Sequence, residues 1–139
     1  MQPTRLNPYI SFKGKAREAM EFYKAAFGGK LEMSTFKESG MQVDASEENN
    51  LMHGMLVADN GMVIMAADTP SHMEYKYGTN ISISLSGDNE TELRGYWDKL
   101  SAGGTISQPL VKAPWGDTFG MFTDKFEINW MVNITAAKA

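Results

Sequence analysis

The clearest alternation of apolar and polar side chains runs from Thr79 to Ser86, where Ile81, Ile83 and Leu85 are separated by polar residues. A period of two residues predicts a β-strand that turns its apolar face to a helix layer. Comparable short runs predict seven further strands, at residues 7–12, 31–36, 51–58, 62–67, 105–111, 117–123 and 128–134. The strands at 51–58 and 62–67 are joined by Asp59-Asn60-Gly61, a sequence typical of hairpin turns.

Two other stretches repeat apolar residues at the spacing of an α-helix. The first runs from Lys15 to Phe27 and ends at Gly28-Gly29, because glycine readily adopts the left-handed conformation after the last turn. The second begins at Asp88-Asn89, where Asn89 and Glu92 predict a capping box, and ends at Gly103-Gly104. The acidic, polar residues 38–50 predict a mobile loop, and residues 70–78 predict a connector.

The order of elements is therefore β-α-β-β-β, twice. The segment 10–14 (ISFKG) recurs 73 residues later as 83–87 (ISLSG), and Gly28-Gly29 recurs 75 residues later as Gly103-Gly104. Two matches in the same order around two helices indicate an internal duplication. We expect one α+β domain over residues 1–139, built of tandem βαβββ modules at about 5–70 and 77–136.

Composition excludes several classes of protein. The chain has no cysteine, so it has neither disulfides, nor a thiolate metal site, nor a cysteine nucleophile. No apolar run approaches the roughly 20 residues needed to span a membrane, and we expect a cytoplasmic protein. The formal charge is −4 and the basic residues are scattered, so nucleic acid is not an expected partner. Most of the eleven methionines are expected to pack in the core, although methionine also lines adaptable pockets.

Several short motifs, in this order and at this spacing, resemble one known family. They are residues 7–12 (NPYISF), 19–29 (AMEFYKAAFGG), 52–53 (MH), 65–68 (MAAD), 115–120 (WGDTFG) and 124–126 (DKF), with Trp130. The chain is similar over nearly its whole length to the vicinal oxygen chelate superfamily of glyoxalases, extradiol dioxygenases and bleomycin-resistance proteins, in its PhnB-like branch. The resemblance implies cupped mixed sheets that face each other around a cavity, each with a helix behind, and a homodimer.

The name 3-demethylubiquinone 3-methyltransferase is attached to some PhnB-like sequences. This chain does not support that activity, because no glycine-rich loop that could cradle S-adenosylmethionine follows any of its strands.

The resemblance also implies where a metal-dependent relative would hold a divalent ion, on the cavity side of the first and last strand of each module. The register of the repeat places these positions at Tyr9, Met65, Ser82 and Met131, and an error of one residue would replace Tyr9 by Pro8. Hydroxyl and thioether groups do not substitute for imidazole and carboxylate around a hard or borderline cation. We therefore expect no metal and no other cofactor, with a divalent metal as the alternative.

Two histidines remain as candidate chemical groups. His53 lies within a strand, where it is either a ligand-contacting group or general base, or a structural side chain hydrogen-bonded in the sheet. His72 lies in the connector and is expected to be solvated. A metal site that combines His53 and His72 with Asp68 or Glu74 is conceivable, but the spacing does not require it.

The leading hypothesis is a metal-free protein that binds a small molecule between its modules. Trp115, at a loop–strand junction, either closes over a flat ligand together with Phe119 or packs at the barrel end or in a dimer interface. The expected ligand contacts are Tyr9, His53, Met65, Ser82, Trp115, Phe119 and Met131. Two alternatives stay open: a lyase, isomerase or dioxygenase with a non-standard metal site around His53, and a non-catalytic dimeric module. His53 is the one candidate catalytic residue.

Overall fold

A computed structural model describes residues 5–76 and 78–136. The chain divides into two compact units, Met1–Lys76 and Tyr77–Ala139, which are called the first and the second module below. None of the helices in the described part of the chain is long and apolar enough to cross a membrane.

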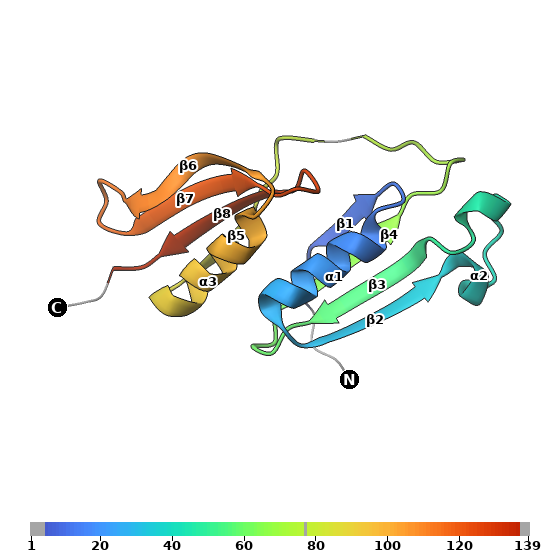
Figure 1. The fold of residues 1–139 in the computed structure, drawn as a ribbon, viewed down its shortest axis with the longest axis horizontal. Helices are drawn as coiled ribbons and strands as arrows, with labels where there is room; N and C mark the ends of the chain where they lie inside the picture. The colour runs from blue at the N-terminus through green and yellow to red at the C-terminus, as the bar shows by residue number, and fades with distance from the viewer. Residues whose placement is uncertain (1–4, 77, 137–139) are drawn as a thin grey trace. The chain divides into compact units, whose positions relative to one another are not determined.

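The first module is one mixed sheet with a helix against it (Figure 1). Its elements are β1 (Tyr9–Phe12), α1 (Ala16–Phe27), β2 (Lys30–Thr35), α2 (Phe36–Ser39), η1 (Ala45–Glu47), β3 (Leu51–Val57) and β4 (Val63–Asp68). The strand order is β1-β4-β3-β2, with β1 parallel to β4 and the other pairs antiparallel.

The second module repeats this arrangement. Its elements are β5 (Ile83–Gly87), α3 (Glu90–Ser101), β6 (Thr105–Lys112), β7 (Thr118–Thr123) and β8 (Asn129–Ile134). The strand order β5-β8-β7-β6 has the same parallel and antiparallel pairs in the same places. The expected α+β fold of two βαβββ modules is confirmed.

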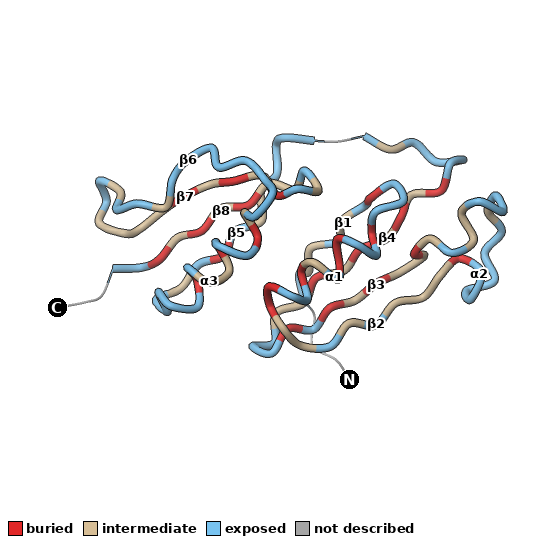
Figure 2. The backbone as a smooth tube through the Cα atoms, viewed as in Figure 1, coloured by how far each residue is buried: buried red, intermediate tan, exposed pale blue. Residues whose placement is uncertain are grey.

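One face of each sheet is buried under its helix, and the other face is open within its own module (Figure 2). In β4, Ile64 and Ala66 are buried against α1, whereas Val63 and Met65 between them are only half-buried. This alternation follows from the two-residue period of a strand and gives α1 an apolar surface on which to pack.

Aromatic side chains fill the core of the second module. The Trp97 ring of α3 meets Phe122 edge-on at 5.0 Å between centroids, and Phe122 stacks on Trp130 at 6.4 Å. Gly120 lies directly beneath the indole, since a Cβ there would be 2.6 Å from Trp97 Cη2. The absence of a side chain at Gly120 therefore allows Trp97 to pack against the sheet.

Each module also buries one carboxylate. Asp68 Oδ1 accepts the Ala16 amide that begins α1, and its Oδ2 accepts the Leu51 amide that begins β3, both at 3.0 Å. Asp124 accepts the Trp130 indole N–H at 2.9 Å and two amides of its own turn. A buried carboxylate is tolerated because such hydrogen bonds replace its hydration.

Two expectations about local structure need correction. The predicted loop 38–50 contains η1 and follows α2, whose first turn is capped by Thr35 and Glu38 in a reciprocal capping box. Ser71 ties this segment down further, since its hydroxyl donates to Asp44 and Glu47. The strand predicted at 79–86 begins only at Ile83, after an irregular segment.

Candidate functional site

The open face of the first sheet carries most of the residues that the sequence singled out. Tyr9 of β1 pairs with Met65 of β4, and Met65 pairs in turn with Met55 of β3. His53 lies two residues before Met55 and therefore projects from the same face. These four residues, Tyr9, His53, Met55 and Met65, are called the first open face below.

Within the first open face, the Tyr9 and His53 rings lie 6.0 Å apart between centroids. Their strands are not neighbours, because β4 runs between β1 and β3. Adjacent strands are about 4.8 Å apart, so the backbones of β1 and β3 are separated by roughly 10 Å. Both rings must therefore lean over β4, the strand that carries Met65. Tyr9 is 52% exposed, and His53 and Met65 are half-buried.

The open face of the second sheet has the same layout with other side chains. Met121 of β7 pairs with Met131 of β8, and Phe119 lies two residues before Met121. The Phe119 ring meets Trp115 edge-on at 5.6 Å, and Trp115 is 62% exposed. Phe119 thus occupies the position that His53 has in the first module.

The pairing of strands corrects the register of the repeat. Met131 pairs with Ser84, as Met65 pairs with Tyr9, so Ser84 is the structural equivalent of Tyr9. Ser82, which a constant offset of 73 residues selected, lies before β5 begins. The error is two residues, so a serine stands at the fourth position in either register.

Polar groups at the edge of this second face are engaged within the module. The Asn133 amide donates to Asp117 Oδ2 at 3.0 Å, and the Ala136 backbone N–H donates to Asp117 Oδ1. These two bonds, the backbone one first, hold the pKa of Asp117 below its ordinary value of 3.8. Asn129 likewise lies within hydrogen-bonding distance of Thr123.

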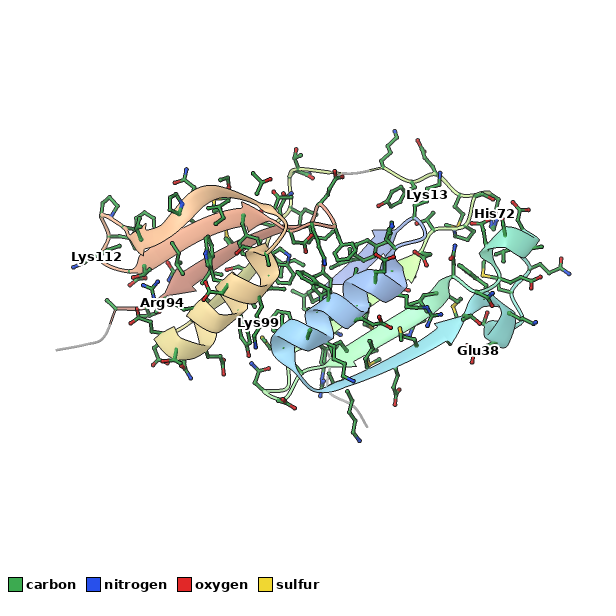
Figure 3. All side chains as sticks on the ribbon, viewed as in Figure 1. Lys13, Glu38, His72, Arg94, Lys99 and Lys112 are labelled. Carbon is green, nitrogen blue, oxygen red and sulfur yellow. The ribbon has the colours of Figure 1, made fainter. Side chains whose placement is uncertain are left out.

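The alternative site that joins both histidines to a carboxylate is not formed by these residues. Asp68 projects to the buried face of β4, opposite His53, and its oxygens accept backbone amides. His72 is exposed and lies at the end of the module near α2 (Figure 3). Glu74 pairs with Lys76 on the surface. Alternation along β4 could have shown this, because Asp68 shares the parity of Ile64 and Ala66.

The four positions that the resemblance assigns to metal ligands are Tyr9, Met65, Ser84 and Met131. Phenol, hydroxyl and thioether groups do not fit a divalent ion of the kind held by imidazole and carboxylate. Within the described part of the chain, no three histidine or acidic side chains lie together as metal ligands would.

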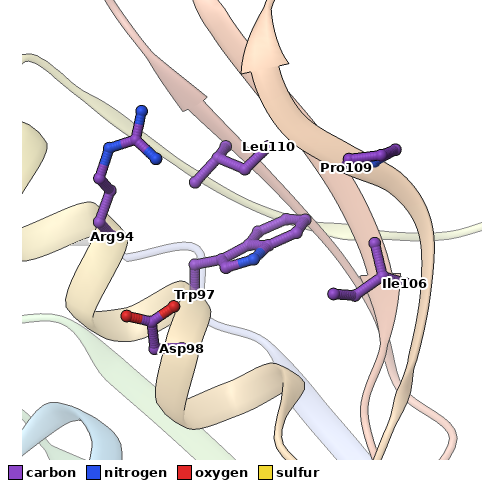
Figure 4. Close-up of a pocket in the computed structure, with 6 residues that line it drawn as sticks. All are labelled: Arg94, Trp97, Asp98, Ile106, Pro109 and Leu110. Carbon is purple, nitrogen blue, oxygen red and sulfur yellow. The ribbon is translucent and has the colours of Figure 1, made fainter.

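The sequence did not reveal a further hollow in the second module, between α3 and β6 (Figure 4). It has a volume of about 260 Å³ and is lined by Arg94, Trp97, Asp98, Ile106, Pro109 and Leu110. The pairing of β6 with β7 shifts register on both sides of Gln108, so β6 departs from regular geometry where it passes the helix. Pro109 is the sequence signal that could have indicated this irregularity.

Comparison with known proteins agrees with this geometry. Residues 5–132 match the family model described as the Glyoxalase/Bleomycin resistance protein/Dioxygenase superfamily. The chain belongs to this superfamily. The family assignment made from the sequence motifs is thereby confirmed.

Members of the superfamily similar to this chain include solved structures and a curated protein. Protein PA1353 from Pseudomonas aeruginosa is 34% identical with a TM-score of 0.86, over 97% of this chain and all of that one. The PhnB protein from Bacillus cereus is 25% identical with a TM-score of 0.74, over 95% of this chain and all of that one. Protein YjdN of Escherichia coli K12 is 29% identical over 93% of this chain and 94% of its own.

Proposed function

We propose that this chain is a small-molecule-binding protein whose ligand lies on the first open face and the corresponding face of the second module. The observation that carries the proposal is the Tyr9–His53 ring pair leaning over Met65 on a face that its own module leaves uncovered. Aromatic rings give a large contact area at low entropic cost, and methionine adapts to ligand shape. Such a surface, with few orienting polar groups, suits a flat and largely apolar ligand.

The second module supports the same proposal. Trp115 and Phe119 form an exposed edge-on pair beside Met121 and Met131. Binding needs neither a nucleophile nor an acid–base pair.

The test is a thermal-shift screen with a library of planar aromatic compounds. A ligand present at 100 times its Kd stabilises the folded state by about 2.7 kcal/mol, which corresponds to about 5–10 °C in Tm for a domain of this size. The shift should shrink in Tyr9→Ala and Trp115→Ala. The matched control is Ile106→Ala, which alters the hollow between α3 and β6 and leaves both open faces intact. A library that shifts nothing, or a shift that only Ile106→Ala removes, would refute this site.

An enzyme built on a divalent metal is a separate outcome that elemental analysis can detect. Protein purified without an affinity tag should carry no stoichiometric Zn, Ni, Mn or Fe if the proposal is right. A stoichiometric metal that is lost in His53→Ala would replace the binding protein by a metalloenzyme.

We further propose a homodimer. In the second module, Ile81, Val111 and Trp115 are each more than half exposed, and apolar surface of this kind is typical of interaction sites. Sedimentation equilibrium should give twice the chain mass of 15.4 kDa. A cytoplasmic location, proposed from the cysteine-free composition, is tested by cell fractionation.

A further inference from the structure

Each module places two methionines directly opposite each other on its open face. Met55 of β3 pairs with Met65 of β4, and Met121 of β7 pairs with Met131 of β8 at the corresponding positions of the second sheet. Directly paired residues have Cβ atoms about 5 Å apart, so the flexible side chains can bring their sulfur atoms to one point. All four side chains are half-buried rather than packed in the core.

The two pairs differ in the third donor that accompanies them. In the first module His53 shares the face of Met55, and its ring leans over β4 towards Tyr9 and thus over the strand of Met65. In the second module this position is Phe119, which offers no donor atom. The first open face therefore combines two thioethers with an imidazole, and the second has two thioethers alone.

Thioether sulfur is a soft donor that selects Cu(I), and imidazole also suits copper. The same chemistry that makes the first open face a poor site for a divalent borderline ion makes it a good one for a soft monovalent ion. Glu32, which pairs with Met55 from β2, is an exposed carboxylate beside the cluster and supplies a compensating charge.

We propose that the first module binds one soft monovalent cation, Cu(I) or its redox-inert analogue Ag(I), through Met55 Sδ, Met65 Sδ and the His53 imidazole. The site shares a surface with the proposed organic ligand but does not depend on it. The second module, which lacks the imidazole, binds such an ion much more weakly.

The experiment is a titration of the full chain with silver nitrate in chloride-free buffer, followed by NMR of ¹³C-labelled methionine methyl groups. The Met55 and Met65 methyl signals should shift together and saturate at one equivalent. Cu(I), supplied anaerobically with a competing chelator, should bind with the same stoichiometry. The double variant M55L/M65L should lose this step, and His53→Gln should weaken it at least about tenfold. Leucine has nearly the volume of methionine, so these variants retain the fold.

The chain provides a matched control in M121L/M131L, which removes the equivalent pair and should leave the first equivalent of silver unchanged. Two results would overturn the proposal. One is a titration in which the exposed Met41 and Met73 shift in parallel with the cluster and no step appears at one equivalent. The other is an equal loss of affinity in the two double variants.

The same variants separate this inference from the proposed function. M55L/M65L keeps the apolar surface, so a planar organic ligand should still raise its Tm while the silver step is gone. If organic ligands bind but silver affinity is the same in M55L/M65L as in the unaltered chain, only the metal site fails. If silver binds stoichiometrically and no organic compound does, only the proposed function fails.

Discussion

The buried carboxylate of Asp124 offers a sharp test of what stabilises the second module. Its Oδ1 accepts the Phe126 and Ile128 amides at 2.8 and 3.0 Å, and its Oδ2 accepts the Trp130 indole N–H at 2.9 Å. Asp124 is 2% exposed, so water cannot replace a lost partner. In Asp124→Asn one oxygen becomes an NH₂ group, and whichever way the amide is turned, a donor faces a donor.

The expected cost follows from these contacts. A hydrogen bond to a charged group contributes about 1.5–3 kcal/mol, and a buried donor left without an acceptor costs about 1–3 kcal/mol. We therefore expect Asp124→Asn to lower the free energy of unfolding by about 3 kcal/mol. Trp130→Phe removes the opposing indole N–H and keeps a ring against Phe122. In the double variant the donor conflict is gone, so the two costs should fall short of additivity by about 1–2 kcal/mol.

The assay is urea unfolding followed by far-UV circular dichroism, since tryptophan fluorescence changes with the substitution itself. Asp98→Asn, on the exposed side of α3, is the charge-matched control and should change stability by less than about 0.5 kcal/mol. The reasoning is wrong if Asp124→Asn is as stable as this control. It is also wrong if the costs of Asp124→Asn and Trp130→Phe simply add.

Three further predictions concern the helices and their contacts. Gly120→Ala places a methyl group 2.6 Å from Trp97 Cη2 and should cost about 1–3 kcal/mol in thermal unfolding, and an unchanged Tm would contradict this close contact. Asn89→Ala removes the side chain that accepts the third amide of α3 and should cost about 1 kcal/mol by urea unfolding, whereas a neutral effect would mean that the cap is dispensable. The Thr35 backbone N–H, which donates to Glu38, holds the pKa of Glu38 below its ordinary value of 4.5. Because a lowered carboxyl pKa stabilises the fold above that value, the stabilisation should disappear as the pH falls through the folded pKa, and an NMR midpoint for Glu38 at or above 4.5 would refute it.

The sequence predicted the order and type of the main elements because two strong periodicities alternate along the chain. The period of two also placed Met65 and Met131 on the open faces, since buried Ala66 and Val132 lie beside them. What it could not supply was the register between strands. That register depends on how many residues each loop takes up, and the first module has α2 and η1 where the second has a shorter connection. A constant offset therefore selected Ser82 instead of Ser84.

The segment after β2 shows a signal that was available in the sequence. Thr35-Phe36-Lys37-Glu38 is a Thr-x-x-Glu capping box, which indicates the start of a helix, yet its acidic surroundings favoured a loop. The contact between Tyr9 and His53 was beyond reach, because it depends on the strand order β1-β4-β3 and on ring orientation. Periodicity shows the face of a strand on which a residue lies, but not its neighbours on that face.

The two buried carboxylates differ in the length of chain that each one closes, and this difference bears on the order of folding. Asp124 joins residues no more than six positions away, so its bonds can form as soon as the β7–β8 turn closes. Asp68 joins Ala16, 52 residues earlier, to Leu51, 17 residues earlier, and its bonds must wait until α1, β3 and β4 have met. Closing a long loop costs more chain entropy before any contact is gained. Two modules of the same topology should thus have different folding nuclei, with φ-values near Asp124 higher than those near Asp68.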